Sequence, residues 1–263
     1  MNLFKQFMIS VQFIGLKDTL RVIQASLLRD WYEWRFKEDR PAGEPLSPGL
    51  MVEMVASSRG GVFHFQNASL EVYFLDTDLV RMSWNPGKSP PSGCLVRTAW
   101  PDVKCSHRET EKGAYILSTD ALSVEVDKKG AVLFQDHHAN LLRREHPPQR
   151  TGQAWKHTFE LSSDEKVYGL GERAAPLNLR RAEAEREEIT FELWNEDPGG
   201  HYSTGDDPLY ISIPVFITRK PGGNTLLFYN NPHKGSFSLP ADPEQEGEAN
   251  ISFTGGMLRY LFS

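Results

Sequence analysis

Residues 70–84 read LEVYFLDTDLVRMSW, and this stretch decides the fold class. Apolar side chains occupy every second position on both sides of a polar Asp-Thr-Asp turn at 76–78. A period of two is typical of a strand that buries one face, and a short turn between two such runs predicts a hairpin over 69–84. The alternating apolar residues are Leu70, Val72, Phe74, Val80, Met82 and Trp84.

The same period recurs along most of the chain after residue 50, with turn residues between the runs. About ten short strands of this kind predict a mostly β protein built as an antiparallel β-sandwich. Strands do not alternate with helices, which argues against a catalytic (β/α)8 barrel in these residues. The further predicted strands lie at 122–126, 131–135, around Phe159 and Leu161, at 189–193, 211–215, 224–229 and 237–239, and on both sides of Gly255-Gly256.

The amino-terminal part has a different pattern. Leu20, Ile23, Leu27, Trp31 and Trp34 recur at steps of three and four, which predicts an amphipathic helix from about Asp18 to Phe36. Prolines and glycines follow between 41 and 49. We therefore expect two parts, a helical leader with its linker over 1–49 and a β-sandwich domain over 50–263.

Composition limits the possible partners. The formal net charge is −6, whereas nucleic-acid binders need clustered Lys and Arg, so we expect no nucleic-acid partner. No run of eighteen apolar residues occurs, so we expect no membrane partner. The apolar first fifteen residues are interrupted by polar side chains and precede no signal cleavage motif, so we expect a cytoplasmic protein. Cys94 and Cys105 leave a single disulfide open.

Few motifs carry chemistry on their own. Residues 169–174, GLGERA, fit a dinucleotide-binding fingerprint, but no buried strand precedes them and Pro176 would interrupt the required helix, so we expect a tight glycine turn. The eight histidines show no metal-ligand spacing, and we expect no metal site.

The loop 194–208 is rich in Asp, Gly and Tyr, which suits either sugar binding or a plain solvated connection. Adjacent carboxylates on one loop cannot flank a glycosidic bond, so no catalytic residue is expected.

Four motifs in sequence order point to one family. Residues 167–173, VYGLGER, resemble the YGLGER signature of family-31 glycoside hydrolases, the α-glucosidases and α-xylosidases. The stretches 176–180 (PLNLR), 193–197 (LWNED) and 205–214 (GDDPLYISIP) are similar to three further motifs of that family. The resemblance covers about 50–263 and is strongest from 167 to 216.

This resemblance implies a sandwich of the galactose-mutarotase-like kind that packs beside a (β/α)8 barrel. The barrel of such an enzyme supplies the aspartate nucleophile and the acid/base aspartate, and its Trp-x-Asp-Met-Asn-Glu motif is missing from this sequence. The resemblance also implies that Asp197 contacts the substrate sugar and, as a weaker case, that Asp207 does. An oligosaccharide or α-glucoside would be the substrate, and no cofactor is implied.

Two other functions stay open at this stage. The chain could be a free-standing carbohydrate-binding module, or an aldose-mutarotase-like enzyme with a His acid and a Glu base in reach of one sugar ring. We further expect the terminal stretch 257–263 to end as a strand at an exposed sheet edge, with unpaired backbone groups, and a contiguous apolar patch to adjoin the loop 194–208.

Overall fold

The computed structural model describes residues 3–35, 43–85, 95–97, 99–181, 188–198, 202–242 and 246–263. The chain divides into two compact units, Met1–Arg40 and Pro41–Ser263. The first unit holds helices α1 (Leu3–Ile14) and α2 (Leu16–Arg35). In the described residues, no helix combines the length and the apolar character needed to cross a membrane.

Helix α2 confirms the helix predicted from the apolar period, although it begins two residues earlier and Phe36 lies outside the described residues. Helix α1 was not predicted. Its apolar residues show a helical period as those of α2 do, but the apolar first fifteen residues were considered only as a possible signal sequence. Gly15 separates the two helices because it adopts a φ of +82°, a left-handed conformation that glycine enters without a steric penalty.

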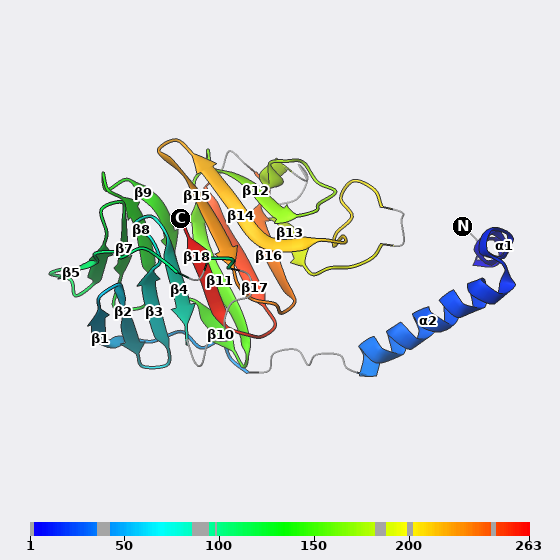
Figure 1. Ribbon diagram of the computed structural model, residues 1–263, viewed down its shortest axis with the longest axis horizontal. Helices are drawn as coiled ribbons and strands as arrows, with labels where there is room; N and C mark the ends of the chain where they lie inside the picture. Colours follow the sequence, from blue (N-terminus) through cyan, green and yellow to red (C-terminus); the bar gives the residue numbers. More distant parts are fainter. Residues whose placement is uncertain are drawn as a thin grey trace. The chain divides into compact units, whose positions relative to one another are not determined.

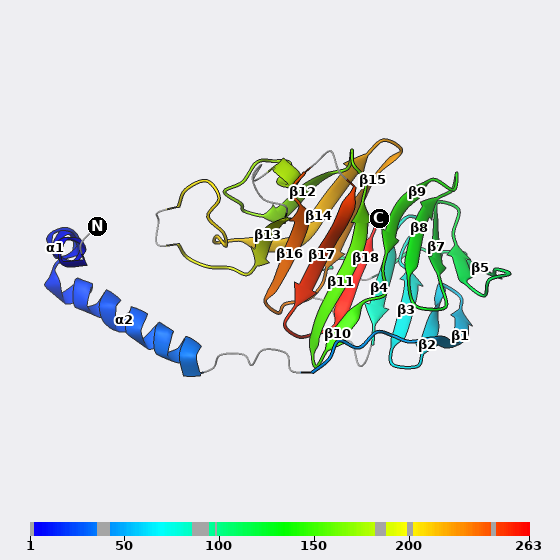
Figure 2. The same ribbon diagram turned by 180° about the vertical axis from the view of Figure 1, so that it is seen from behind.

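The second unit consists of two antiparallel sheets that face each other (Figures 1 and 2). The eight-stranded sheet contains, in spatial order, β1 (Met51–Ser57), β2 (Gly60–Phe65), β3 (Ser69–Phe74), β4 (Val80–Trp84), β18 (Leu258–Phe262), β15 (Gly223–Tyr229), β14 (Ser212–Lys220) and β12 (Lys166–Gly171). The ten-stranded sheet contains β13 (Glu188–Leu193), β16 (Gly235–Pro240), β17 (Gly247–Phe253), β11 (Ala154–Leu161), β9 (Leu141–Glu145), β8 (Val132–Asp136), β7 (Leu122–Val126), β6 (Tyr115–Ser118) and β5 (Ser106–Glu109), with β10 (Gln149–Thr151) paired to β11.

This architecture confirms the predicted mostly β, two-layer fold, and the described residues contain no (β/α)8 barrel. The hairpin over 69–84 is present as β3 and β4, and the one over 122–135 as β7 and β8. The division of the chain at residue 50 stays a proposal. Residues just before it already contact the sandwich, since Leu46 pairs with Arg150 across an isolated bridge.

The core lies between the sheets, where most of the strands bury side chains at alternate positions. Aromatic rings join the two layers: Phe134 of β8 stacks on Phe262 of β18 with centroids 4.0 Å apart, and Phe159 of β11 stacks on Phe216 of β14 at 5.9 Å. Such pairs combine a large buried area with a preferred ring geometry.

The expectation that the terminal stretch forms a frayed edge is wrong. Strand β18 lies inside the eight-stranded sheet, where it pairs with β4 on one side and β15 on the other (Figure 1). All five of its residues are buried. The strands on either side of Gly255-Gly256 belong to different sheets, so the chain crosses between the layers at this point instead of forming a hairpin.

A buried ionic network also crosses the core. Glu145 of β9 accepts hydrogen bonds from Arg143 Nε at 2.6 Å and from the Tyr260 hydroxyl of β18, and it lies 3.3 Å from His157 Nε2 of β11. His157 Nδ1 in turn meets the Tyr229 hydroxyl of β15 at 2.9 Å. The network therefore connects two strands of each sheet through groups that solvent does not reach.

The groups around Glu145 determine its protonation state. Burial by itself raises the pKa of its carboxyl, but His157 and Arg143 outweigh that effect with their charges and, together with hydrogen bonds from His157 and Tyr260, lower the pKa to about 2. The Tyr260 hydroxyl has a raised pKa because it is buried and lies beside the negative Glu145. Glu145 is thus held as a carboxylate and Tyr260 as a neutral donor.

We expect acid to destabilise the fold through Glu145. Because its pKa is lowered in the folded state from 4.5 to about 2, its contribution is fully present above pH 4.5 and is lost as the pH falls through about 2, a difference of about 3 kcal/mol. Glu145→Gln should remove this pH-dependent contribution to the free energy of unfolding. Because Arg143 then stays buried without its partner, the free energy of unfolding at neutral pH should fall by about 3–5 kcal/mol. Urea denaturation across this pH range measures both effects.

The matched control for that experiment is Glu71→Gln. Glu71 pairs with Arg81 at 3.1 Å, but both side chains are partly exposed, so its loss should change the free energy of unfolding by no more than about 1 kcal/mol. Equal effects of the two substitutions would contradict a special role of the buried network.

A second expectation concerns β18. Phe262→Ala should lower the free energy of unfolding by about 3–5 kcal/mol, because it removes a fully buried ring that stacks on Phe134. The control is Leu226→Ala on the exposed face of neighbouring β15. It should change the free energy of unfolding by about 1 kcal/mol or less. Thermal or chemical denaturation gives the comparison, and a mild effect of Phe262→Ala would mean that β18 frays as an edge strand does.

Candidate functional site

The two ends of the loop between β13 and β14 are joined by hydrogen bonds. Asn195 accepts a hydrogen bond from the Ser212 amide at 2.6 Å, and the Glu196 amide donates to the Leu209 carbonyl at 3.0 Å. Figure 1 shows this connection extending from the end of the sandwich where β12, β13 and β14 meet. The two ends of the loop are therefore fixed close together on the sheets. Loops positioned by a rigid scaffold in this way commonly carry binding groups.

Arg173, the last residue of the GLGER stretch, ties the loop to the sheet. Its guanidinium donates to Asp207, to Ser212 Oγ at 3.1 Å and to the Leu170 carbonyl at 3.2 Å. The planar fork of arginine suits several fixed acceptors at once. Arg173 is almost fully buried, so these bonds are shielded from water.

Asp207 completes the same anchor. One of its oxygens receives Arg173 and the other accepts the backbone amide of Glu192 on β13. The neighbouring Asp206 accepts from the Ser203 amide at 2.6 Å and so shapes the adjoining turn. Both oxygens of Asp207 are engaged within the protein, and its predicted contact with a sugar stays a prediction.

Asp197 lies on the exposed part of the loop. It is close in sequence to the pinned Asn195 and Glu196, so the loop base places it without enclosing it. The structure thus brings Asp197 and Asp207 into one loop with different environments. The predicted sugar contact of Asp197 also stays a prediction.

The glycines of residues 169–171 have a structural role. Gly169 and Gly171 both have positive φ, and a Cβ would lie 2.5 Å from the Val215 carbonyl oxygen at Gly169 and 2.4 Å from that of Ile211 at Gly171. They allow β12 to lie against β14 through a bulge in the ladder, so this is a bulged strand end, not the tight turn expected from the sequence. The helix that a dinucleotide site requires does not follow among the described residues.

Pro214 falls in the same bulge. The register passes from Gly169–Phe216 to Gly171–Ser212, which leaves Pro214 opposite no ladder partner. A residue without an amide hydrogen fits there, because no ladder hydrogen bond is lost.

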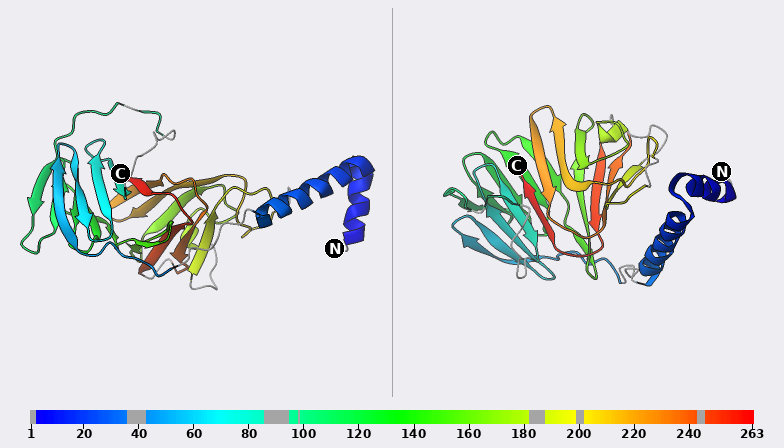
Figure 3. Two further views of the ribbon diagram at one scale, coloured as in Figure 1. Left: turned by 90° about the horizontal axis from the view of Figure 1, so that it is seen from below. Right: turned by 45° about the vertical axis from the view of Figure 1, so that its right-hand side comes forward.

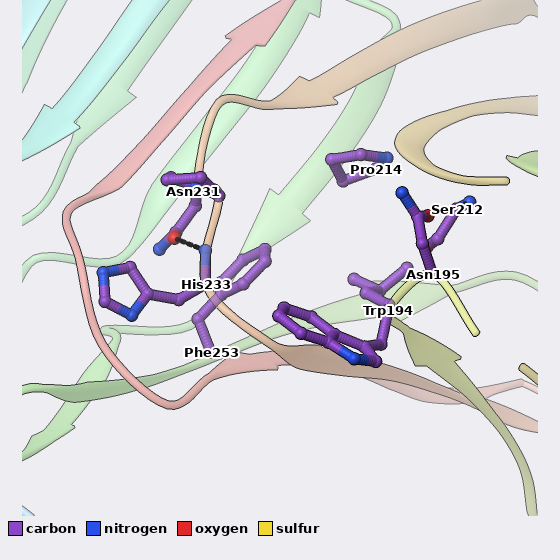
Figure 4. Close-up of a pocket in the computed structure, with 9 residues that line it drawn as sticks. Trp194, Asn195, Ser212, Pro214, Asn231, His233 and Phe253 are labelled. Atoms are coloured by element: carbon purple, nitrogen blue, oxygen red, sulfur yellow. Dashed lines mark hydrogen bonds between the residues drawn. The ribbon is translucent and has the colours of Figure 1, made fainter. Parts of the chain in front are cut away.

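A cavity of about 360 Å³ opens beside the loop base (Figure 4). Trp194 forms part of its wall and is 45% exposed. Asn231, on the connection after β15, donates to the Gly255 and Met257 carbonyls and accepts from the His233 amide, which orders the polar side of the cavity. The residues lining it are Leu193, Trp194, Asn195, Ser212, Pro214, Asn231, Pro232, His233 and Phe253.

An aromatic face beside amide and imidazole groups suits a polar ring with an apolar face, such as a pyranose. Sequence reasoning identified the segment around Trp194 but missed Arg173, Asn231 and His233 as residues that shape the site. The only available signal for the last two was the turn-like Asn-Asn-Pro-His stretch at 230–233.

Comparisons with known proteins agree with this geometry. A family model for the glycosyl hydrolase 31 N-terminal galactose mutarotase-like domain matches residues 60–238. The match covers more than half of the chain, and the chain therefore belongs to this family. This confirms the resemblance drawn from the four motifs.

Several relatives carry glycosidase names. An α-glucosidase 2 of Bacillus thermoamyloliquefaciens is 27% identical over 206 residues, which are 75% of this chain and 24% of that protein. An α-xylosidase of Emericella nidulans is 34% identical over 103 residues, 39% of this chain and 11% of that protein. The structure of a family-31 dextranase of Flavobacterium johnsoniae superposes with a TM-score of 0.69 at 20% identity, over 82% of this chain and 26% of that one. The chain thus spans about a quarter of the length of the Bacillus enzyme and of the dextranase.

Arg173→Lys should loosen the loop, because lysine cannot supply the fork that reaches Asp207, Ser212 Oγ and the Leu170 carbonyl together. We expect roughly tenfold faster hydrogen exchange at the amides of Glu192 and Gly205, with faster proteolysis between 202 and 206. Arg219→Lys, on the exposed face of β14, serves as the control and should leave exchange in the loop unchanged. Unchanged exchange in both variants would show that Arg173 does not hold the loop.

Proposed function

We propose that this chain is the amino-terminal sandwich of an α-glucosidase-type glycosidase that hydrolyses α-glycosidic bonds of an oligosaccharide or α-glucoside. The observation that carries the proposal is the family match over 60–238, together with three of the four family motifs, whose residues meet at one loop and its anchor. The names of the relatives include α-glucosidase, α-xylosidase and dextranase, and the dextranase structure is described in complex with isomaltotriose. The catalytic carboxylates would come from the barrel domain.

In this proposal the loop 194–208 contributes to the substrate site. Asp197 offers an exposed carboxylate to sugar hydroxyls, and Trp194 offers an exposed ring face beside the cavity. Asp207 supports the site by fixing the loop through Arg173, and a direct sugar contact would have to use its remaining lone pairs. A carboxylate positioned on a pinned loop loses little freedom when it binds, which favours recognition.

An apolar face on the eight-stranded sheet provides a docking surface for the barrel. Register places Ile217 of β14 between Leu226 of β15 and Tyr168 of β12, on the side opposite to the buried Phe216. Val215 and Phe228 form the next row. Ile217 and Leu226 are 42% and 39% exposed, although they lie on a sheet.

Ile211 and Ile213 extend this face to the end of the loop 194–208 and are also exposed. Contiguous apolar surface of this kind marks interaction sites, and interfaces between domains of one chain bury roughly 600–1,500 Å². This supports a (β/α)8 barrel as the partner that covers the face and receives the loop.

The two alternative functions receive less support. Family membership favours the glycosidase over a free-standing binding module. For a mutarotase, His157 and Glu145 are fully buried and bonded to each other, so a sugar cannot reach them. His146 lies on the surface but only 3.2 Å from Glu248, which leaves no room for a sugar ring between the acid and the base.

Two further expectations belong to the proposal. Cytoplasmic residence fits a chain with only two cysteines, of which Cys94 lies outside the described residues. The net charge of −6 supports the absence of a nucleic-acid partner.

The chain by itself should neither cleave an aryl α-glucoside nor bind maltose more tightly than the millimolar range. One or two charge-assisted hydrogen bonds contribute about 1.5–3 kcal/mol each, which does not offset the several kcal/mol needed to immobilise a free sugar. Product release and isothermal calorimetry measure the two quantities. Micromolar binding would favour the independent module, and turnover abolished by one carboxylate substitution in this chain would place the catalytic site here.

The role of Asp197 is tested in the protein expressed together with the coding sequence downstream of residue 263. Asp197→Asn should raise KM for the α-glucoside by about tenfold or more, since it removes the charge from a hydrogen bond to the sugar. Asp164→Asn, at another exposed position of the sandwich, is the matched control and should leave KM unchanged. If the two variants behave alike, Asp197 is not a substrate contact.

A further inference from the structure

The helical unit α1–α2 carries a large exposed apolar surface outside the region that the family match covers. On α2 the apolar side chains follow one another at steps of three and four and so lie along one face. Each of them is between 40% and 73% exposed. They are Leu16, Leu20, Ile23, Leu27, Trp31 and Trp34.

Outside this face α2 carries four basic and three acidic residues, together with apolar residues such as Val22 and Leu28. Lys17, Arg21, Arg29 and Arg35 lie away from the apolar face, and Arg21 and Arg29 form exposed ion pairs with Asp18 and Asp30. An apolar face with tryptophan, on a helix whose remaining positions carry basic side chains, is typical of a helix that lies in a membrane interface.

Helix α1 strengthens this interpretation. Only one of its 12 residues, Lys5, carries a charge. Its exposed apolar side chains include Met8, Phe13 and Ile14, with Phe13 83% exposed. A helix with so few charges and so many exposed apolar side chains normally packs against a protein surface or against lipid. At about 18 Å it is shorter than the roughly 30 Å hydrocarbon layer, so it fits along the interface and not across it.

Charge distinguishes the helices from the rest of the chain. Residues 1–35 contain five basic and three acidic side chains, a formal charge of +2, whereas the whole chain has −6 and the remainder therefore −8. A basic, aromatic-rich unit on an acidic protein is complementary to an anionic lipid surface.

We propose that the α1–α2 unit binds the surface of an anionic phospholipid membrane, with the face Leu20–Leu27–Trp34 in the acyl boundary and the basic side chains at the headgroups. The sequence-based expectation of no membrane partner considered only spanning runs, which an interfacial helix does not need. A second copy of the chain fits less well. The apolar repeat at Leu16, Leu20, Ile23 and Leu27 meets Asp30 at its next position, which disfavours a continuous apolar seam between two copies.

The full chain is tested by sedimentation with vesicles. We expect binding to phosphatidylcholine vesicles that contain about 30% phosphatidylglycerol, much weaker binding to phosphatidylcholine alone, and release as salt increases. Leu20→Ser/Leu27→Ser should lower the partition coefficient by about tenfold or more, because it removes two side chains from the lipid-facing side.

The matched control is Val22→Ser/Leu28→Ser. It makes the same kind of change at two exposed apolar positions outside that face. Its partition coefficient should stay within about threefold of that of the unmodified chain. An equal loss in both variants, or no binding to the mixed vesicles, overturns the proposal. A discrete dimer in sedimentation velocity that Leu20→Ser/Leu27→Ser dissociates, without vesicle binding, would assign the face to a second copy instead.

Discussion

The eight-stranded sheet is continuous only because β18 lies between β4 and β15. Strands β1 to β4 come from the start of the sandwich sequence, while β15, β14 and β12 come from its second half, and no other described strand joins these two groups. The backbone of five residues, Leu258–Phe262, therefore connects them (Figure 3). The same strand places Phe262 on Phe134 and Tyr260 on Glu145, so it also connects the two layers.

The buried network around Glu145 has a specific place in this arrangement. A carboxylate, a guanidinium and a histidine inside a core are tolerated only when they satisfy one another, because an unpaired charge there is strongly unfavourable. Their partners come from β9, β11, β15 and β18, so the charges are satisfied only when the sheets are aligned correctly. The ionisable side chains of this network therefore stabilise the fold and are not accessible to a ligand.

The candidate site depends on the scaffold in a similar way. Residues of the family motifs meet at one end of the sandwich because β12 and β14 are neighbours there, and because Asp207 also bonds the backbone of β13 in the opposite sheet. Arg173 and Asp207 act on the site through the loop that they hold, whereas Trp194 and Asp197 are the exposed groups. Most of these motif residues thus build the loop base, and a smaller number, such as Trp194 and Asp197, are exposed.

Much of this protein could be predicted from its sequence. Strands with one buried face, such as 70–74 and 122–126, were identified because their alternation reflects burial directly. Helix α2 was identified for the equivalent reason at a period of 3.6, and the order of the motifs identified the family and pointed to the loop with Asp197. Some strands were missed: Ser106–Glu109 is exposed throughout and has no pattern to detect, and Gly60–Phe65 was missed although it buries Phe63 and Phe65. Only the tertiary structure decided that the terminal stretch is a central strand, that Arg173 finds Asp207, and that His157 and Glu145 are hidden from any sugar. The physical reason is that periodicity records how one segment faces solvent, whereas pairing partners and the burial of a charge depend on segments far away in the chain.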